Sequence, residues 1–245
     1  MHDPQSQNSW HNADMHFGGA MTVADADPQI RTDFLHRTYQ HLALAIAAFV
    51  GVEFLLFQIP NIDVLAAKMV SGYAWLVVLG LFMVVSNVAN KWAHSNISVE
   101  RQYLGLGLYV VAEAILFLPL LYIAAFYTDG SVIPSAALIT GIVFGGLTAT
   151  VLITKKDLTF LGGILRIAGF AALGLIVASF VFGLNLGVIF SAAMVVFAAG
   201  AIAYETSNMV HHYRPDQHVA AALGLFASVA LLFWYVINLL MSARD

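Results

Sequence analysis

Two stretches of the chain, residues 69–90 and 130–154, contain no charged side chain and are mostly apolar. A helix needs about 20 apolar residues to cross the hydrocarbon core of a bilayer, and each stretch is long enough. Strands that cross a membrane alternate apolar and polar residues, whereas these two runs are continuously apolar. The chain is therefore predicted to be an all-α membrane protein.

Composition supports this fold class and narrows the function. The chain has 245 residues, of which 60% are hydrophobic and 10% charged, whereas about 25% are charged in a soluble domain. A net charge of -4 without a basic arm argues against a nucleic-acid partner. The absence of cysteine excludes disulfides and thiolate metal sites. Because phosphate-loop, zincin and nucleophile-elbow motifs are also missing, we expect a non-enzymatic protein without a cofactor.

Charged residues and turn signals divide the chain into seven predicted spans. Residues 158–213 are too many for one crossing, and Gly183, Asn185 and Gly187 predict a turn that divides them. The predicted spans are residues 42–59, 69–90, 102–128 and 130–154, two spans within 158–213, and residues 220–241. We assign residues 1–36 to a disordered N-terminal tail and residues 37–245 to a transmembrane domain of seven helices.

Lysine and arginine predict the orientation. With seven spans, the tail and the even-numbered loops share one side of the membrane. That side holds seven of the ten basic residues, the other side holds Lys68 and Arg244, and Arg166 lies inside the fifth span. The seven are Arg31, Arg37, Lys91, Arg101, Lys155, Lys156 and Arg214. The positive-inside rule therefore predicts a multi-pass protein with a cytoplasmic N-terminus.

Three carboxylates, Glu53, Glu113 and Glu205, lie within the predicted spans. Such residues are costly in lipid, usually face the bundle interior, and lie on ion or proton paths. Glu205, three residues before Asn208, is the main candidate for a protonatable gate or a calcium ligand, because carboxylate oxygens suit hard cations. Alternatively, it is a helix-end acid that reaches the interface. Glu113 either lines the ion path or hydrogen-bonds a neighbouring helix, and Glu53 is expected to snorkel to the surface.

Basic groups near these acids offer two further interpretations. Arg166 is expected either to pair with Glu205 or Glu113, which would neutralise both partners, or to snorkel to the cytoplasmic surface. Three histidines of the last cytoplasmic loop titrate near neutral pH. They either bias a pH-dependent gate or are simply solvated. They are His211, His212 and His218.

Several short segments between residues 37 and 238 follow one another in a characteristic order. The most specific is TKKDLTFL at 154–161, after the fourth predicted span. The others are RTY at 37–39, AE at 112–113 followed by Pro119, YETSN at 204–208, LGLF at 223–226 and INL at 237–239. This pattern resembles the bacterial branch of the Bax inhibitor-one family, also called the transmembrane Bax inhibitor motif family.

The resemblance implies seven helices, one of them central and surrounded by the others. It also implies a pH-sensitive calcium leak, protection from cell death and, in some bacterial relatives, binding of a membrane protease. In the family, aspartates of the sixth and seventh spans form a pH sensor. Here Glu205 takes the first position and Ser228 the second, so two carboxylates cannot share a proton there. Ser228 can donate a hydrogen bond to Glu205, and either Glu113 supplies the second acid or the sensing is altered.

We therefore expect a pH-modulated calcium leak channel of the bacterial inner membrane, with calcium as the permeant ion. One alternative is a non-channel regulator that binds a membrane protease or another membrane partner. Another is a proton-coupled cation transporter, because buried carboxylates suit that function as well. The sequence leaves the oligomeric state open.

Overall fold

The computed structural model describes residues 21–95 and 98–243. Within these ranges the fold consists of eight helices and contains no strand. They are α2 (Pro28–Leu56), α3 (Ile62–Val70), α4 (Ala74–Ala93), α5 (Val99–Phe126), α6 (Val132–Thr154), α7 (Leu161–Phe182), α8 (Gly187–His211) and α9 (His218–Ser242). All except α3 are long and apolar enough to cross a membrane, which confirms the predicted seven spans.

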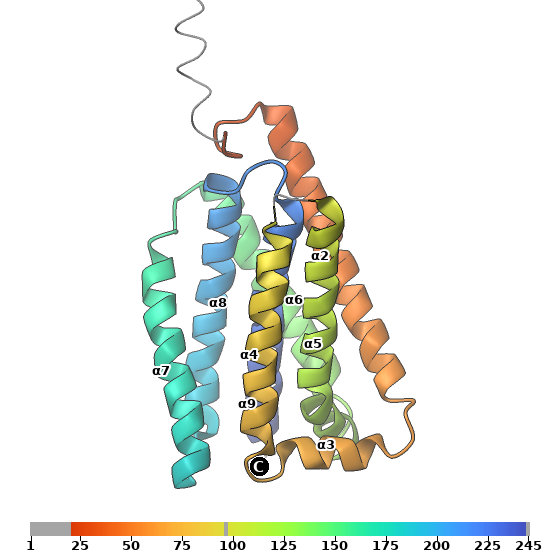
Figure 1. Ribbon diagram of the computed structural model, residues 1–245. Helices are drawn as coiled ribbons and strands as arrows, with labels where there is room; N and C mark the ends of the chain where they lie inside the picture. Colours follow the sequence, from red (N-terminus) through yellow and green to blue (C-terminus); the bar gives the residue numbers. More distant parts are fainter. Residues whose placement is uncertain (1–20, 96–97, 244–245) are drawn as a thin grey trace, which may run out of the picture.

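Helix α9 lies at the centre of the bundle (Figure 1) and packs against α2, α4, α5, α6 and α8. In the most apolar stretch of α9, 67% of the residues are buried, the largest share among the seven spanning helices. The corresponding share in α7 is 6%. The contacts between α2, α5 and α9 are aromatic, because Phe49 meets both Phe117 and Phe226 with its ring edge-on. The predicted arrangement around one central helix is therefore present.

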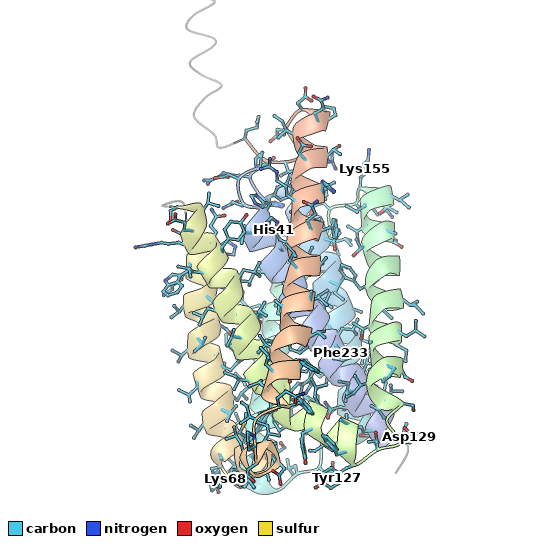
Figure 2. The ribbon with its side chains drawn as sticks, turned by 90° about the vertical axis from the view of Figure 1, so that its right-hand side faces the viewer. His41, Lys68, Tyr127, Asp129, Lys155 and Phe233 are labelled. Atoms are coloured by element: carbon cyan, nitrogen blue, oxygen red, sulfur yellow. The ribbon has the colours of Figure 1, made fainter. Side chains whose placement is uncertain are left out.

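The bundle has two ends, which we name the tail face and the opposite face. The tail face carries residues 21–27 and the loops that follow α4, α6 and α8, and the opposite face carries α3 and the loops that follow α5 and α7. Figure 2 shows Lys155 at the tail face and Lys68, Tyr127 and Asp129 at the other. The distribution of lysine and arginine predicts that the tail face is cytoplasmic.

Helix α2 begins earlier than the sequence predicted, at Pro28 rather than near residue 42. The side chain of Asp27 caps it by accepting a hydrogen bond from the Gln29 amide (3.0 Å), and proline suits the first helical position. Val23 is fully buried, and its amide donates to the Tyr213 carbonyl at 2.8 Å. The part of the predicted disordered tail from residue 21 to 36 is thus packed and largely helical, and residues 1–20 lie outside the described residues.

Helix α3 was not predicted, because Asp63 and Lys68 interrupt the apolar pattern there. It lies across the opposite face in Figure 1 and buries Ile62, Ala66 and Met69, which share one side of the helix. Gly72 then adopts a φ of 50°, a left-handed conformation that glycine accepts without steric cost. This turn delays the second span, which starts at Ala74 instead of the predicted residue 69.

Candidate functional site

A cavity of about 890 Å³ lies along the central helix and is partly open to the outside of the bundle; α4 and α5 border it on one side, and α7 and α8 on the other. One face of the central helix lines it, at Gly224, Ser228, Leu231, Tyr235, Asn238 and Ser242. The 18 steps from Gly224 to Ser242 correspond to about 27 Å at 1.5 Å per residue, close to the roughly 30 Å thickness of a hydrocarbon core. The cavity is therefore long rather than local, and we call it the passage.

The passage reaches the opposite face but ends before the tail face. Its lining includes residues 184–187 of the loop between α7 and α8. Toward the tail face the lining ends at Asn90, Glu205 and Leu223. Beyond them, Tyr213 is buried, and its hydroxyl lies 3.4 Å from His94 Nε2. Together with Val23, these residues close the tail-face end.

The charged side chains that line the passage within the described part of the chain are all acidic. Glu113 and Glu205 both line it, together with Asn90, Asn238 and Ser228. Among the described residues, no lysine, arginine or histidine lines it. A passage with acidic groups and apolar walls favours cations and excludes anions.

Glu113 lies near the middle of α5 and is only 5% exposed. The hydroxyl of Tyr109, one turn earlier, lies beside its carboxyl group. Its Oε2 atom is buried and has no hydrogen-bond partner within the described part of the chain. A buried polar atom without a partner is costly, so this oxygen favours a proton or a cation that can reach it.

Glu205 lies on α8 and rests directly against the backbone of α9 at Gly224. A Cβ atom added at Gly224 would lie 2.7 Å from Glu205 Oε2, so any larger residue there would displace the carboxylate. The sequence analysis noted the LGLF segment but did not identify this role for its glycine. Asn90 and Asn238 were also missed, because a single polar residue near a helix end carries no signal of its own.

Comparison with known proteins identifies the family. The family model described as "Inhibitor of apoptosis-promoting Bax1" matches residues 31–245. The chain belongs to this family. An uncharacterized protein of Pseudomonas aeruginosa is 31% identical over 222 residues, which cover 87% of this chain and 90% of that protein.

Eukaryotic and viral proteins are similar over nearly the whole chain. Protein lifeguard 4 of Mus musculus is 27% identical over 247 residues, covering 97% of this chain and 96% of that protein. A Golgi anti-apoptotic protein of vaccinia virus is 26% identical over 231 residues, 91% of each chain. The Bax inhibitor family likeness that the sequence motifs indicated is thus confirmed.

The two family sensor positions lie on facing helices, but their side chains do not bond to each other. Ser228 is buried in the passage wall and donates its hydroxyl to the Gly224 carbonyl at 3.0 Å instead of to Glu205. Asn208 is not among the residues that line the passage. Its carbonyl accepts hydrogen bonds from the amides of His212 (2.9 Å) and Tyr213 (3.3 Å), which end α8.

Arg166 does not form the ion pair that the sequence analysis considered. It is exposed on α7, a helix that packs mainly against α8 at the edge of the bundle. Within the described residues, the one salt bridge joins Arg214 to Asp216 at 2.8 Å. The hydrogen bonds from Arg214 lower the pKa of Asp216, so this loop pair is charged at neutral pH while Glu205 and Glu113 have no basic partner.

Glu53 does not snorkel to the surface, contrary to the prediction. It is 6% exposed, and neither carboxylate oxygen has a hydrogen-bond partner among the described residues. The reason is that Glu53 follows Phe49 by one turn and shares the side of α2 that packs on α5 and α9. Glu53 is also absent from the lining of the passage. It is therefore a buried acid outside the candidate site.

The histidines of the last loop lie at the closed end. His211 Nδ1 lies 2.8 Å from the carbonyl of Ser207. The ring of His218 is tilted by 56° against that of His41, with the centroids 5.0 Å apart, and His41 Nε2 lies 2.9 Å from the Tyr103 hydroxyl. His211 and His218 are thus part of the tail-face packing, whereas His212 is exposed. None of the three lines the acidic passage.

Proposed function

We propose that this Bax inhibitor family member is a pH-modulated leak pathway for cations, with calcium as the physiological ion. The observation that carries the proposal is the passage itself: about 27 Å of α9 face a cavity that holds two carboxylates and no basic side chain among the described residues. The proposed function is not enzymatic. We place the protein in a bacterial plasma membrane with the tail face in the cytoplasm, as the basic residues predict.

In this proposal the cation enters from the opposite face. It keeps part of its hydration shell along the apolar walls and meets Glu113 first. The ion then reaches Glu205, where Asn90 on α4 supplies a further oxygen at the end of the lining. Carboxylate and amide oxygens replace lost water around a hard cation. Flux requires that the contacts of Val23, Tyr213 and His94 at the tail face open.

Protonation supplies the modulation. A neutral carboxyl group retains little of the attraction that a carboxylate exerts on a divalent ion in a low-dielectric passage. Acidification that protonates Glu113 and Glu205 should therefore reduce calcium entry. We expect lower flux near pH 6 than near pH 8, and the two glutamates should be responsible for the difference.

Calcium flux into liposomes that contain the purified protein tests the proposal at both pH values. Glu205→Gln and Glu113→Gln should each reduce flux at least about tenfold, since loss of roughly 1.4 kcal/mol of attraction is tenfold. Glu53→Gln is the matched control, because Glu53 is as buried as Glu113 but does not line the passage. Its flux should stay within about twofold of the wild type.

Two results would count against the leak. Flux that is unchanged in both passage variants at each pH would remove the glutamates from the path. Flux that requires an imposed proton gradient would instead indicate a proton-coupled transporter. A passive leak should follow the calcium gradient alone.

A second candidate function is regulation of a membrane partner such as a protease. The vaccinia relative is named as an anti-apoptotic protein, and the name of the mouse relative mentions no transport activity. In addition, Ser228 stands where the family pattern has a second acid. In this alternative the N-terminal segment is the docking element. Deleting residues 1–20, which leaves the Val23 contact with Tyr213 intact, should then abolish co-purification with a membrane protease. Retention of the protease would exclude the deleted segment as its docking site.

A further inference from the structure

The half of the passage nearer the opposite face has aromatic walls. Trp75 on α4 and Trp234 on α9 are stacked, with ring centroids 5.7 Å apart and planes inclined by 18°. Phe117 on α5 meets Trp234 edge-on at 4.9 Å. All three residues line the cavity. Aromatic faces attract cations, and tryptophan does so most strongly.

The acidic group nearest this aromatic wall is Glu113. It precedes Phe117 by one turn of α5, a rise of about 6 Å along the helix axis, and both residues line the cavity. Its buried Oε2 atom has no hydrogen-bond partner among the described residues. The carboxyl group of Glu113 and the aromatic wall are therefore separated by about one helical turn along α5.

This combination does not suit a resident metal ion. A calcium site needs six to eight oxygen ligands, and the described residues contain no group of three or more histidines, aspartates or glutamates that could hold a metal. An organic ammonium group needs only one carboxylate and aromatic faces around it. The volume of about 890 Å³ is also in the range of small-molecule sites, roughly 300–1,000 Å³.

We propose that the passage binds an amphipathic organic cation. Its ammonium group lies at Glu113, and its apolar part extends along Phe117, Trp234 and Trp75 toward the opposite face. The absence of basic side chains from the described lining leaves the carboxylate free for this ligand. The inference goes beyond the proposed leak, because it concerns occupancy of the aromatic half and not the passage of metal ions.

Binding of a fluorescent cation tests the inference without any flux measurement. The probe is a dimethylaminostyryl-methylpyridinium dye, whose emission rises in apolar sites. Its control is the same dye without the N-methyl group, which is neutral near pH 8. The full-length protein is placed in nanodiscs of uncharged phosphatidylcholine, and the signal of empty nanodiscs is subtracted.

The charged dye should bind the wild type at least about tenfold more tightly than its neutral analogue. Glu113→Gln should weaken the charged dye by about tenfold and leave the neutral one unchanged. Trp234→Leu should weaken the charged dye roughly fivefold, the size of a cation–π contact, whereas Glu53→Gln should have no effect. Size-exclusion profiles verify the fold of each variant.

Equal binding of the charged and neutral dyes to the wild type would overturn the inference, and this comparison needs no variant. Equal binding of the charged dye to wild type and to correctly folded Glu113→Gln would overturn it as well. The dye measurements do not depend on calcium flux, so they test the inference even if the protein does not conduct calcium. Conversely, a protein that conducts calcium but does not bind the dye would support the leak proposal and overturn the inference.

Discussion

Replacing Gly105 with alanine should destabilise the bundle by roughly 3 kcal/mol or more, at the upper end of overpacking costs. A Cβ atom at this position would lie 2.6 Å from both the Ala89 carbonyl oxygen and the Ala93 amide nitrogen. Both are backbone atoms, so α4 and α5 must move apart as whole helices. Small residues allow such close approach between membrane helices. The melting temperature of the purified protein should fall by about 6–12 °C.

Gly107, two residues later on α5, is the matched control. A Cβ atom there meets no other atom within 4 Å, and alanine favours a helix over glycine by about 1 kcal/mol. Gly107→Ala should therefore melt at the wild-type temperature or slightly above it. A similar fall in both variants would show that an effect common to both substitutions, such as the response of the protein to the detergent, and not the contact between α4 and α5, determines the result.

Replacing Ser228 with aspartate should add a titration step to the pH dependence of calcium flux. Ser228 lines the passage one turn after Gly224, which touches the Glu205 carboxylate. Two carboxylates about 6 Å apart repel each other by roughly 3 kcal/mol at an effective dielectric constant of 20. The pair would then share a proton over part of the pH range. The ratio of flux at pH 8 to flux at pH 6 should change at least about tenfold in the liposome assay.

Ser228→Asn is the control for this substitution, because asparagine has nearly the same shape as aspartate and carries no charge. Its pH profile should match the wild type. If the aspartate and asparagine variants behave alike, then position 228 acts through size or hydrogen bonding, and the distance between the two acids is too great for them to couple. Combining Ser228→Asp with Glu205→Gln should remove the step that arises from coupling between the two acids.

The membrane class, the seven spans and the family could be predicted from the sequence because they depend on long runs of residues. Charge-free stretches such as 130–154 are read directly as helices, and α6 ends at Thr154 as expected. Span boundaries were less accurate where a helix extends beyond the membrane. The amphipathic turns of α2 before residue 42 carry Arg31, Asp33 and Arg37, and these charges resemble a solvated tail.

The candidate site was predictable only in part, because the direction in which a side chain points depends on packing. Glu53, Glu113 and Glu205 look alike as lone acids in apolar runs, yet two line the passage and one lies between α2 and its neighbours. Arg166 resembled a partner for them, but it is exposed on α7, which lies at the edge of the bundle. The stack of Trp75 on Trp234 joins residues far apart in the chain, and no local pattern predicts it.

The central position of α9 has a consequence for how the protein is made. This helix packs against five others, yet it is the last of the eight described helices to leave the ribosome. Until then, α2, α4, α5, α6 and α8 are inserted around a space that only α9 fills, and they are exposed to lipid and to one another. The core is therefore complete only after α9 has been made. We expect nascent chains that end before residue 218 to be recognised as unassembled, however well their individual helices insert.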